Sequence, residues 1–162
     1  MIGTVARLGL AAVFLISGVL KAVDPDTTYV AVRAYDVLPK SGVAVVATVL
    51  PWLEIALGLL LLAGLATRVV AAVGGALLLV FIAGVTQAWA RGLSIDCGCF
   101  GNGGTIAASQ TQYPQEIARD IGLFACAAWL AVRPRSAVSL DRLLSPVPPA
   151  RTTSTTSTHS TR

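Results

Sequence analysis

The sequence SIDCGCFGNGG at residues 94–104 contains two of the three cysteines of the chain, Cys97 and Cys99, separated by one glycine. A disulfide between residues so close in sequence closes a small ring, whereas ordinary bridges prefer Cα separations of about 5.5 to 6 Å. Gly98 suits such a ring, because glycine adopts unusual backbone angles without a steric cost. Strained and exposed disulfides are the easily reduced ones. The CGC sequence therefore predicts a catalytic redox pair rather than a structural bridge.

Other interpretations of the cysteines stay open. Structural disulfides would need distant partners, and the third cysteine, Cys126, is expected to pack within a helix as a small apolar residue. A tetrahedral zinc site needs four N or S ligands, and within one chain only Cys126, His159 and acids remain to complete it. We therefore expect no metal in a single chain, although two subunits could pool their cysteine pairs around a metal or cluster. A loop without thiol chemistry is the remaining alternative.

The composition is that of a membrane protein. Of the 162 residues, 55% are hydrophobic and only 12% are charged, which is about half the charged share of soluble domains. About 20 helical residues cross the hydrocarbon core of a bilayer, and four apolar stretches suit this purpose. They are residues 5–23, 43–65, 69–89 and, shorter than the others, 117–132. The expected fold class is all-α, an integral membrane four-helix bundle in contact with the lipid bilayer.

The basic residues indicate an orientation, since lysine and arginine gather on the cytoplasmic side of membrane proteins. An even number of spans places both termini on one side, and the arginines of that side are nearly free of acidic neighbours. We therefore expect a multi-pass protein of the cell membrane with both termini cytoplasmic. The connections at residues 24–42 and 90–116 then face outward, which places the CGC loop on the extracytoplasmic side, where disulfides form and exchange.

Two domains and two kinds of outer connection are expected. Residues 1–135 form the membrane domain, and residues 136–162, rich in proline and then in serine and threonine, form a disordered cytoplasmic tail. The connection at 24–42 has the spacing of a short amphipathic helix on the membrane surface, capped by Asp26 or Thr27. The stretch at 94–112 is rich in glycine and small polar residues, which indicates an irregular loop.

Glu54 is an acidic residue near the middle of the second apolar stretch. An ionised carboxylate there costs a few kcal/mol or more unless it is paired or protonated. Candidate partners in a supporting polar cluster lie at the outer ends of the other stretches: Lys21, Gln87 and Arg119. Lys21 can extend its long side chain to Glu54 inside the bundle. A structural ion pair and a proton-handling role, such as that of a small transporter, are both open.

Four segments of the chain resemble the methylamine utilisation protein MauE family, within the DoxX-like membrane proteins. They are SGVLKAVDP, LPWLEIALGLLLLAG, WARGLSIDCGCFG and PQEIARDIGLFACAAWLAV. The most specific element is DCGCFG, in which Gly98, Phe100 and Gly101 are expected to shape the loop. The resemblance implies a four-helix membrane protein that handles thiols and disulfides. Founding members act in maturation of the disulfide-rich small subunit of methylamine dehydrogenase, beside a thioredoxin-like partner, but their substrate does not carry over.

The residues and the resemblance together predict a thiol–disulfide oxidoreductase activity in the maturation of exported proteins. Cys97 and Cys99 would alternate between dithiol and disulfide, exchange with a thioredoxin-fold protein, and pass electrons to or from a membrane carrier. By analogy with four-helix vitamin K epoxide reductase relatives, that carrier is a quinone. Asp96 should disfavour a thiolate at Cys97, which favours Cys99 as the nucleophile.

The alternative to this enzyme is a non-catalytic membrane scaffold that holds a redox or metalloenzyme maturation partner. No nucleic-acid partner is expected, because the basic residues neither cluster on a polar domain nor alternate with aromatic residues.

Overall fold

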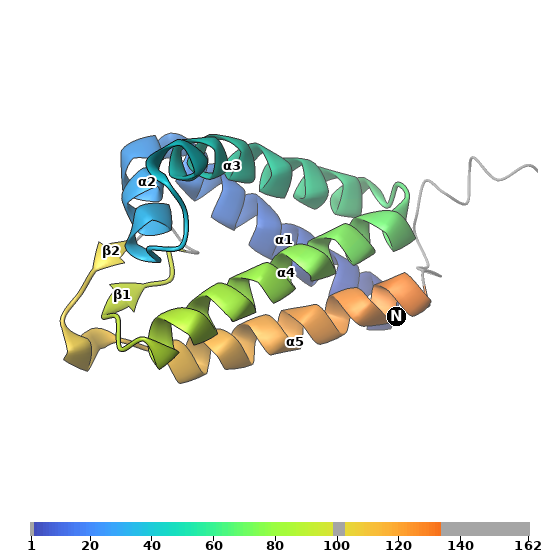
Figure 1. The fold of residues 1–162 in the computed structure, drawn as a ribbon. Coiled ribbons are helices and arrows are strands. Elements are labelled where there is room, and N and C mark those ends of the chain that lie inside the picture. The colour runs from blue at the N-terminus through green and yellow to red at the C-terminus, as the bar shows by residue number, and fades with distance from the viewer. Residues whose placement is uncertain (1, 99–102, 134–162) are drawn as a thin grey trace, which may run out of the picture.

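The computed structural model describes residues 2–98 and 103–133, so Cys99, Phe100, Gly101 and the expected tail at 136–162 lie outside the described residues. The described elements are, in order, α1 (Ile2–Val23), α2 (Pro25–Ala34), α3 (Lys40–Ala63), α4 (Thr67–Ala90), β1 (Ile95–Asp96), β2 (Gly104–Thr105), the 3-10 turn η1 (Ala108–Gln110) and α5 (Tyr113–Val132). The four long helices alternate in direction, and the short α2 lies across one end of them (Figure 1). The expected all-α architecture is confirmed in this part of the chain.

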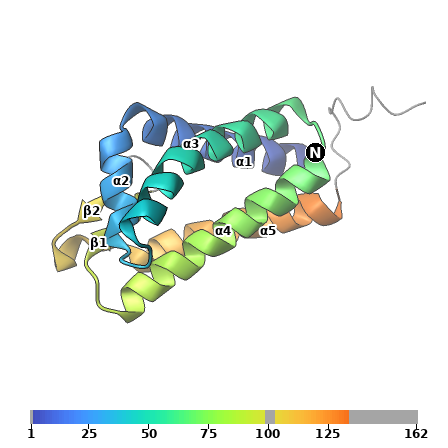
Figure 2. The same cartoon turned by 45° about the horizontal axis from the view of Figure 1, so that its top comes forward.

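The long helices pack as two pairs. Helix α1 packs mainly against α3, and α4 packs mainly against α5, with a further contact between α1 and α5. Helices α3 and α4 follow each other in the chain but touch much less, and they diverge toward the end where α2 lies (Figure 2). The expectation of a simple four-helix bundle is therefore too coarse, because the described residues form five helices and α2 lies across the end at which α3 and α4 diverge.

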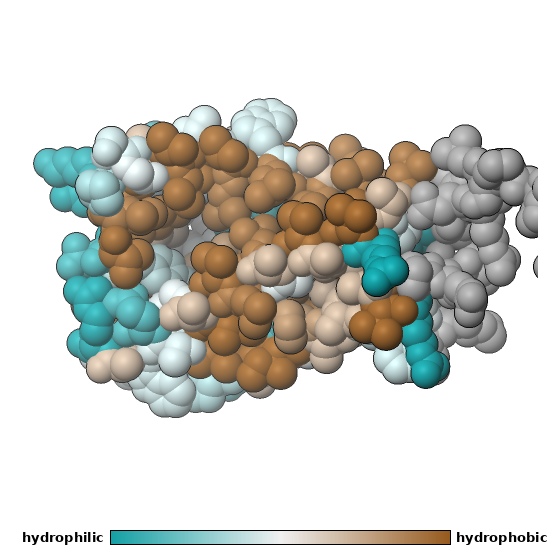
Figure 3. All heavy atoms as spheres, turned by 45° about the vertical axis from the view of Figure 1, so that its right-hand side comes forward, coloured by the Kyte–Doolittle hydropathy of each residue, from teal (hydrophilic) through white to brown (hydrophobic). Residues whose placement is uncertain are grey.

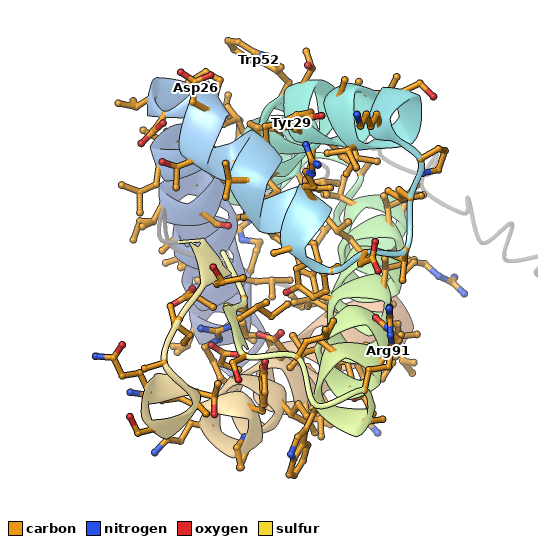
Figure 4. The ribbon with its side chains drawn as sticks, turned by 60° about the vertical axis from the view of Figure 1, so that its left-hand side comes forward. Asp26, Tyr29, Trp52 and Arg91 are labelled. Carbon is orange, nitrogen blue, oxygen red and sulfur yellow. The ribbon has the colours of Figure 1, made fainter. Side chains whose placement is uncertain are left out.

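Three helices are long and apolar enough to cross a membrane. They are Gly3–Val23, Lys40–Ala63 and Thr67–Ala90, and about a third of the most apolar window of each is buried within the protein. The remaining apolar side chains face outward, as the brown surface of Figure 3 shows. Trp52 of α3 is one of them, 65% exposed and directed away from the bundle (Figure 4). The expectation of four spans is confirmed for three helices.

Helix α5 differs from the other three long helices in its first half. Glu116, Arg119 and Asp120 lie there within five residues. By length and composition, α5 is not among the helices that are apolar enough to cross a membrane. Its second half is apolar, and Ala127 and Leu130 of that half are completely buried in the main core. The charged half therefore marks the end of the bundle at which the connection between α4 and α5 lies.

Glycines allow α1 and α3 to approach closely. A Cβ atom added at Gly18 would lie 2.8 Å from the carbonyl oxygen of Pro51, and one at Gly58 would lie 2.6 Å from Leu15 Cγ. Atoms at such distances overlap, so both positions require glycine if the helices keep this separation. Phe14 of α1, 2% exposed, packs instead toward α4, where a Cβ added at Gly74 would lie 2.9 Å from Phe14 Cε2. The close approach sets the distance across which polar groups on α1 and α3 can meet.

A single residue, Asp24, separates the end of α1 from the start of α2, and Asp24 caps α2. Asp24 Oδ1 accepts a hydrogen bond from Thr27 N at 3.0 Å and Oδ2 accepts one from Thr27 Oγ1 at 2.7 Å, while Pro25 occupies the first helical position, which needs no N–H donor. These hydrogen bonds hold the pKa of Asp24 below its usual value. The expectation that Asp26 or Thr27 caps the helix is wrong, because the capping carboxylate precedes the proline.

Gly18→Ala is expected to lower the free energy of unfolding by about 1–3 kcal/mol, because the new methyl group overlaps the backbone of α3. Gly9→Ala on the same helix is the matched control, since a Cβ there meets nothing within 4 Å. Thermal unfolding in detergent, followed by circular dichroism, measures both. Equal stability of the two variants would contradict the close approach of α1 and α3.

Candidate functional site

Two tyrosines hold the segment that leads to Cys97. The hydroxyl of Tyr113, at the start of α5, donates to Leu93 O and accepts from Ile95 N at 3.0 Å. The hydroxyl of Tyr35, just after α2, donates to Cys97 O at 3.0 Å. Tyr113 and Ile95 are buried together in a small apolar cluster at this end of the bundle. One side chain from the start of α5 and one from the residue after α2 thus fix the backbone immediately before and at Cys97.

Arg91, at the end of α4, fastens the turn that follows α2. Its guanidinium donates to Tyr35 O and Asp36 O and forms an ion pair with Asp36, whose Oδ2 lies 3.1 Å from Nη2. Figure 4 shows Arg91 at this end of α4. The ion pair itself is exposed and contributes little to stability. The hydrogen bonds from Arg91 to the carbonyl oxygens of Tyr35 and Asp36 keep the end of α4 next to the turn that contains Tyr35.

A short hairpin replaces part of the expected irregular loop. Strands β1 and β2 are antiparallel, with Ile95 opposite Thr105 and Asp96 opposite Gly104. The returning strand lies against α2, since a Cβ added at Gly103 would collide with the side chain of Ala31 and lie 3.1 Å from its Cα. Strands of two residues carry no periodic pattern, which is why the sequence indicated only a loop here.

Cys97 is half-buried and has charged neighbours of both signs. Arg119 Nη2 lies 4.0 Å from its sulfur, and the ligand atoms of Asp96, Cys97 and Glu116 all lie within 4.8 Å of one another. A nearby guanidinium stabilises a thiolate, whereas carboxylates disfavour it. The expected effect of Asp96 is thus opposed by Arg119. The prediction that Cys99 is the attacking residue stays a prediction.

Glu116 is the second acid beside Cys97 and precedes the apolar part of α5. Partial burial raises the pKa of Glu116, and the charge of Asp96 raises it further, although hydrogen bonds with Cys97 and the charge of Arg119 act in the opposite direction. A carboxyl group with a raised pKa next to a thiol can accept the thiol proton.

Asp96, Cys97 and Glu116 are also the group among the described residues that could hold a metal ion. Their three donor atoms, a thiol and two carboxylates, are one fewer than a tetrahedral zinc site needs. Cys126 lies within α5, and His159 lies outside the described residues.

Gly98 has a φ of +68°, in the left-handed region that favours glycine. Its N–H donates to Asp96 Oδ1 at 3.0 Å. The backbone therefore turns at Gly98.

Lys21 and Glu54 meet inside the bundle, as the sequence predicts. Lys21 Nζ lies 2.9 Å from both carboxylate oxygens of Glu54 and donates to Ser17 Oγ at 2.6 Å. Ser17 Oγ lies 3.3 Å and 3.2 Å from the two oxygens. Glu54 is completely buried, and Lys21 is 6% exposed. Ser17 was missed by the sequence reasoning, although its position four residues before Lys21 puts both on one face of α1.

The other two residues of the expected polar cluster have different partners. When the side-chain amide of Gln87 is oriented so that its oxygen faces a donor, this oxygen accepts a hydrogen bond from Arg91 Nη1 at 2.6 Å. The partner of Gln87 is therefore Arg91 and not Glu54. Arg119 forms an ion pair with Asp120, Nη2 to Oδ1 being 3.0 Å. Asp120 is 2% exposed, and the sequence reasoning did not assign it to the cluster.

Two cavities border the Lys21–Glu54 pair. The larger, about 150 Å³, lies between α2, α3 and α4 and includes Lys21 and Cys97 in its wall. The smaller, about 20 Å³, is lined by Glu54, Arg119 and Asp120 among others, and a polar cavity of that size fits about one water molecule. Phe81 lines both cavities, with Lys21 Nζ 5.5 Å from its ring centre. The ion pair thus lies between the two cavities, with Lys21 in the wall of the larger and Glu54 in the wall of the smaller.

Lys21→Met is expected to lower the free energy of unfolding by about 3–5 kcal/mol, because it leaves the Glu54 carboxylate buried without its cationic partner. The double variant Lys21→Met/Glu54→Leu removes both charges and should recover most of this loss. Thermal unfolding of both variants in detergent makes the comparison. A single variant as stable as the parent protein would show that the pair does not stabilise the bundle.

Gly103→Val should release the hairpin from α2 and expose Cys97, since the added side chain overlaps Ala31. In a background in which Cys99 and Cys126 are serine, Cys97 is the only thiol, and its alkylation by N-ethylmaleimide should accelerate severalfold. Gly122→Val is the control, because a Cβ at Gly122 meets nothing within 4 Å. Identical alkylation rates in the two variants would contradict the docking of the hairpin.

Comparisons with known proteins show the family of this chain. The model of the family described as methylamine utilisation protein MauE matches residues 1–133. The methylamine utilization protein MauE of Paracoccus denitrificans is 39% identical over 98 residues, which are 60% of this chain and 53% of that protein. The chain thus spans about half the length of this curated relative, and no solved structure matches it significantly. Because the family match covers most of the chain, this protein belongs to the MauE family of membrane proteins.

Proposed function

We propose that this MauE-family protein is a membrane thiol–disulfide exchange protein in which Cys97 and Cys99 alternate between dithiol and disulfide. The observation that carries the proposal is the environment of Cys97. Its backbone is held by Tyr35, its sulfur lies 4.0 Å from the Arg119 guanidinium, and the glycine that separates it from Cys99 has a φ of +68°. A fixed thiol beside a cation and next to a sharp turn suits exchange.

The exchange takes place on the extracytoplasmic side in this proposal, with α5 as a fourth span and both termini cytoplasmic. The N-terminal end of α1, the turn between α3 and α4 and the end of α5 lie together, opposite α2 and the hairpin (Figure 1). Of the 12 basic residues, seven belong to the first end or follow α5 in the sequence, against five toward the other end, and this small excess supports its placement in the cytoplasm by the distribution of basic residues. Cys97 then lies in the compartment where disulfides persist.

The chemistry needs a partner that carries a disulfide or a dithiol. In one direction, a thiolate of the pair attacks the partner's disulfide, a mixed disulfide forms, and the second cysteine displaces the partner as a dithiol. Arg119 stabilises negative charge on the Cys97 sulfur, and Glu116 accepts the thiol proton. The reverse sequence oxidises the partner. A thioredoxin-fold protein is the proposed partner, since its own cysteine pair undergoes the same reaction.

The relative from Paracoccus denitrificans is named for methylamine utilization. For this chain we propose the broader role that such chemistry serves: the maturation of exported proteins whose cysteines must be correctly paired. Methylamine utilisation is one setting for that role.

The proposal is tested with purified protein in detergent and a thioredoxin that retains only its attacking cysteine. Oxidised parent protein should form a mixed disulfide with this probe, visible on a non-reducing gel and lost on reduction. Cys97→Ser/Cys99→Ser should lower its yield to that of a buffer control, because no disulfide remains to be attacked. Cys126→Ser is the matched control and should behave as the parent, since Cys126 lies within α5.

A second measurement separates exchange from a scaffold. A cell that lacks the protein is complemented with the parent or with Cys97→Ser/Cys99→Ser, and the disulfide content of its exported proteins is compared. Exchange requires that the double variant fail to complement. Full complementation would overturn the exchange role and fit a protein that only holds a maturation partner at the membrane.

A further inference from the structure

Arg7 is a buried arginine near the start of α1, at the end of the bundle opposite the cysteine loop. It is 3% exposed, and its Nε and Nη1 atoms are buried without a hydrogen-bond partner among the described residues. Arginine is almost never fully buried unless it is paired, because a charge that leaves water without a partner is costly. Arg7 therefore calls for an anion that the described residues do not supply.

The packing of α1 against α4 places Arg7 beside the first turn of α4. A Cβ added at Gly74 of α4 would lie 2.9 Å from Phe14 Cε2, so Phe14 faces α4. Arg7 lies seven residues before Phe14 on α1. Thr67, the first residue of α4 and 1% exposed, lies seven residues before Gly74. Seven residues make about two helical turns, and the two helices run in the same direction (Figure 1). Arg7 and Thr67 thus lie on facing sides of the two helices, at one level.

The first turn of α4 adds backbone donors to the guanidinium. The first N–H groups of a helix have no acceptor within that helix, and Ala66, the N-cap residue of α4, makes no side-chain capping hydrogen bond. Phosphate and other anions bind at helix starts, where N–H groups point outward and the helix dipole favours negative charge. An arginine fork pairs with the oxygens of a phosphate group in the same way as with a carboxylate. The two features together suit a phosphate group.

The same end of the bundle carries further positive charge. Arg68 in the first turn of α4 and Arg133 directly after α5 lie there with Arg7 (Figure 1). Within residues 2–98 and 103–133, the acidic side chains lie in the half of the bundle that holds the hairpin. The deepest of them, Glu54, pairs with Lys21 near the far end of α1. The described part of the protein therefore has a cationic end without a counter-charge.

Exposed apolar side chains surround this cationic site. Val5 and Leu8, next to Arg7 in sequence, are 71% and 43% exposed, and Val69 in the first turn of α4 is 63% exposed. All three belong to helices that are long and apolar enough to cross a membrane. An anion bound to Arg7 thus lies close to surfaces that contact acyl chains. A phospholipid carries a phosphate group and acyl chains in one molecule, whereas a free ion offers nothing to the apolar surface.

We propose that Arg7 and the first turn of α4 bind the phosphate group of an anionic phospholipid, whose acyl chains lie along the exposed apolar side chains of α1 and α4. Arg68 and Arg133 favour a lipid with a net negative charge over a zwitterionic one. The lipid supplies the counter-charge of Arg7 and joins the starts of two helices that make few close contacts of their own. The site lies at the opposite end from Cys97 and does not depend on thiol exchange.

The test measures the binding of dioleoylphosphatidylglycerol to the purified protein in detergent, by native mass spectrometry over a series of lipid concentrations. The parent should bind one equivalent more tightly than any further lipid. Arg7→Met removes the guanidinium and should weaken this binding at least about tenfold, or 1.4 kcal/mol. Arg33→Met is the matched control, because it removes an exposed arginine of α2 at the other end of the bundle, and it should bind as the parent does. Equal affinities of the two variants would overturn the proposal.

Thermal unfolding in detergent gives a second readout. Without lipid, Arg7→Met should unfold at the same temperature as the parent or above it, because an apolar side chain replaces a buried charge that has no partner. Dioleoylphosphatidylglycerol should raise the unfolding temperature of the parent and of Arg33→Met, but not that of Arg7→Met. A lipid-free Arg7→Met that unfolds at a lower temperature would show that Arg7 has its partner within the chain, which contradicts the proposal.

The source of the negative charge is separated by two other ligands and one variant. Dioleoylglycerol, which has the same acyl chains and no phosphate, should not displace the lipid, and its success as a competitor would rule out phosphate recognition. Inorganic phosphate should compete weakly, and displacement at an equal concentration would assign the site to a free ion instead. Asp141, an acidic residue after α5, lies outside the described residues. Asp141→Asn should bind the lipid as the parent does, whereas clearly tighter binding would identify Asp141 as the native partner of Arg7 and refute the lipid site.

Discussion

A buried lysine and a buried glutamate constrain the whole bundle. Lys21 Nζ lies 2.9 Å from both oxygens of Glu54, between α1 and α3, whose sequences are largely apolar. Either charge alone in such surroundings costs several kcal/mol, so α1 and α3 are stable only in a rotation and register that bring the two together. The close approach at Gly18, one turn before Lys21, makes that distance attainable. One ion pair thereby positions the end of α1 from which α2 departs.

Polar residues extend from the Lys21–Glu54 pair in the interior of the bundle to Cys97. Arg119 and Asp120 form a second ion pair, on the far side of a cavity that Glu54 also lines, so positive and negative charges balance pair by pair. Arg119 in addition approaches the sulfur of Cys97. Asp96 and Glu116 also lie beside this sulfur, so the polar region that begins at Lys21 and Glu54 extends to the thiol, and its charged residues lie next to one another rather than singly among apolar side chains.

Local patterns in the sequence predict two parts of this structure: the apolar helices, and the pairing of a buried carboxylate with a cation that can reach it. Three apolar helices follow from their length, and Lys21 follows as the partner of Glu54 because its side chain can reach inward. Such patterns do not predict the partner of a polar side chain when several candidate partners lie within its reach. Gln87 contacts Arg91, four residues along the same helix, and strands of two residues leave no periodic signal. The cavity was not predictable either, because it depends on the angle between α3 and α4, which no local stretch encodes.

That angle also explains why the cavity and the cysteine loop occur at the same end. Helices α3 and α4 are joined by a turn of three residues at one end, with Gly64 and Ala66 at positive φ, and each packs mainly against a different partner, α1 or α5. They must therefore separate toward the other end, where α2 enters between them and the segment around Cys97 closes the remaining space (Figure 2). A thiol at this position borders both the apolar space between the helices and the outer end of the protein. The divergence of the two helices thus places the Cys97 side chain in the wall of the cavity between them.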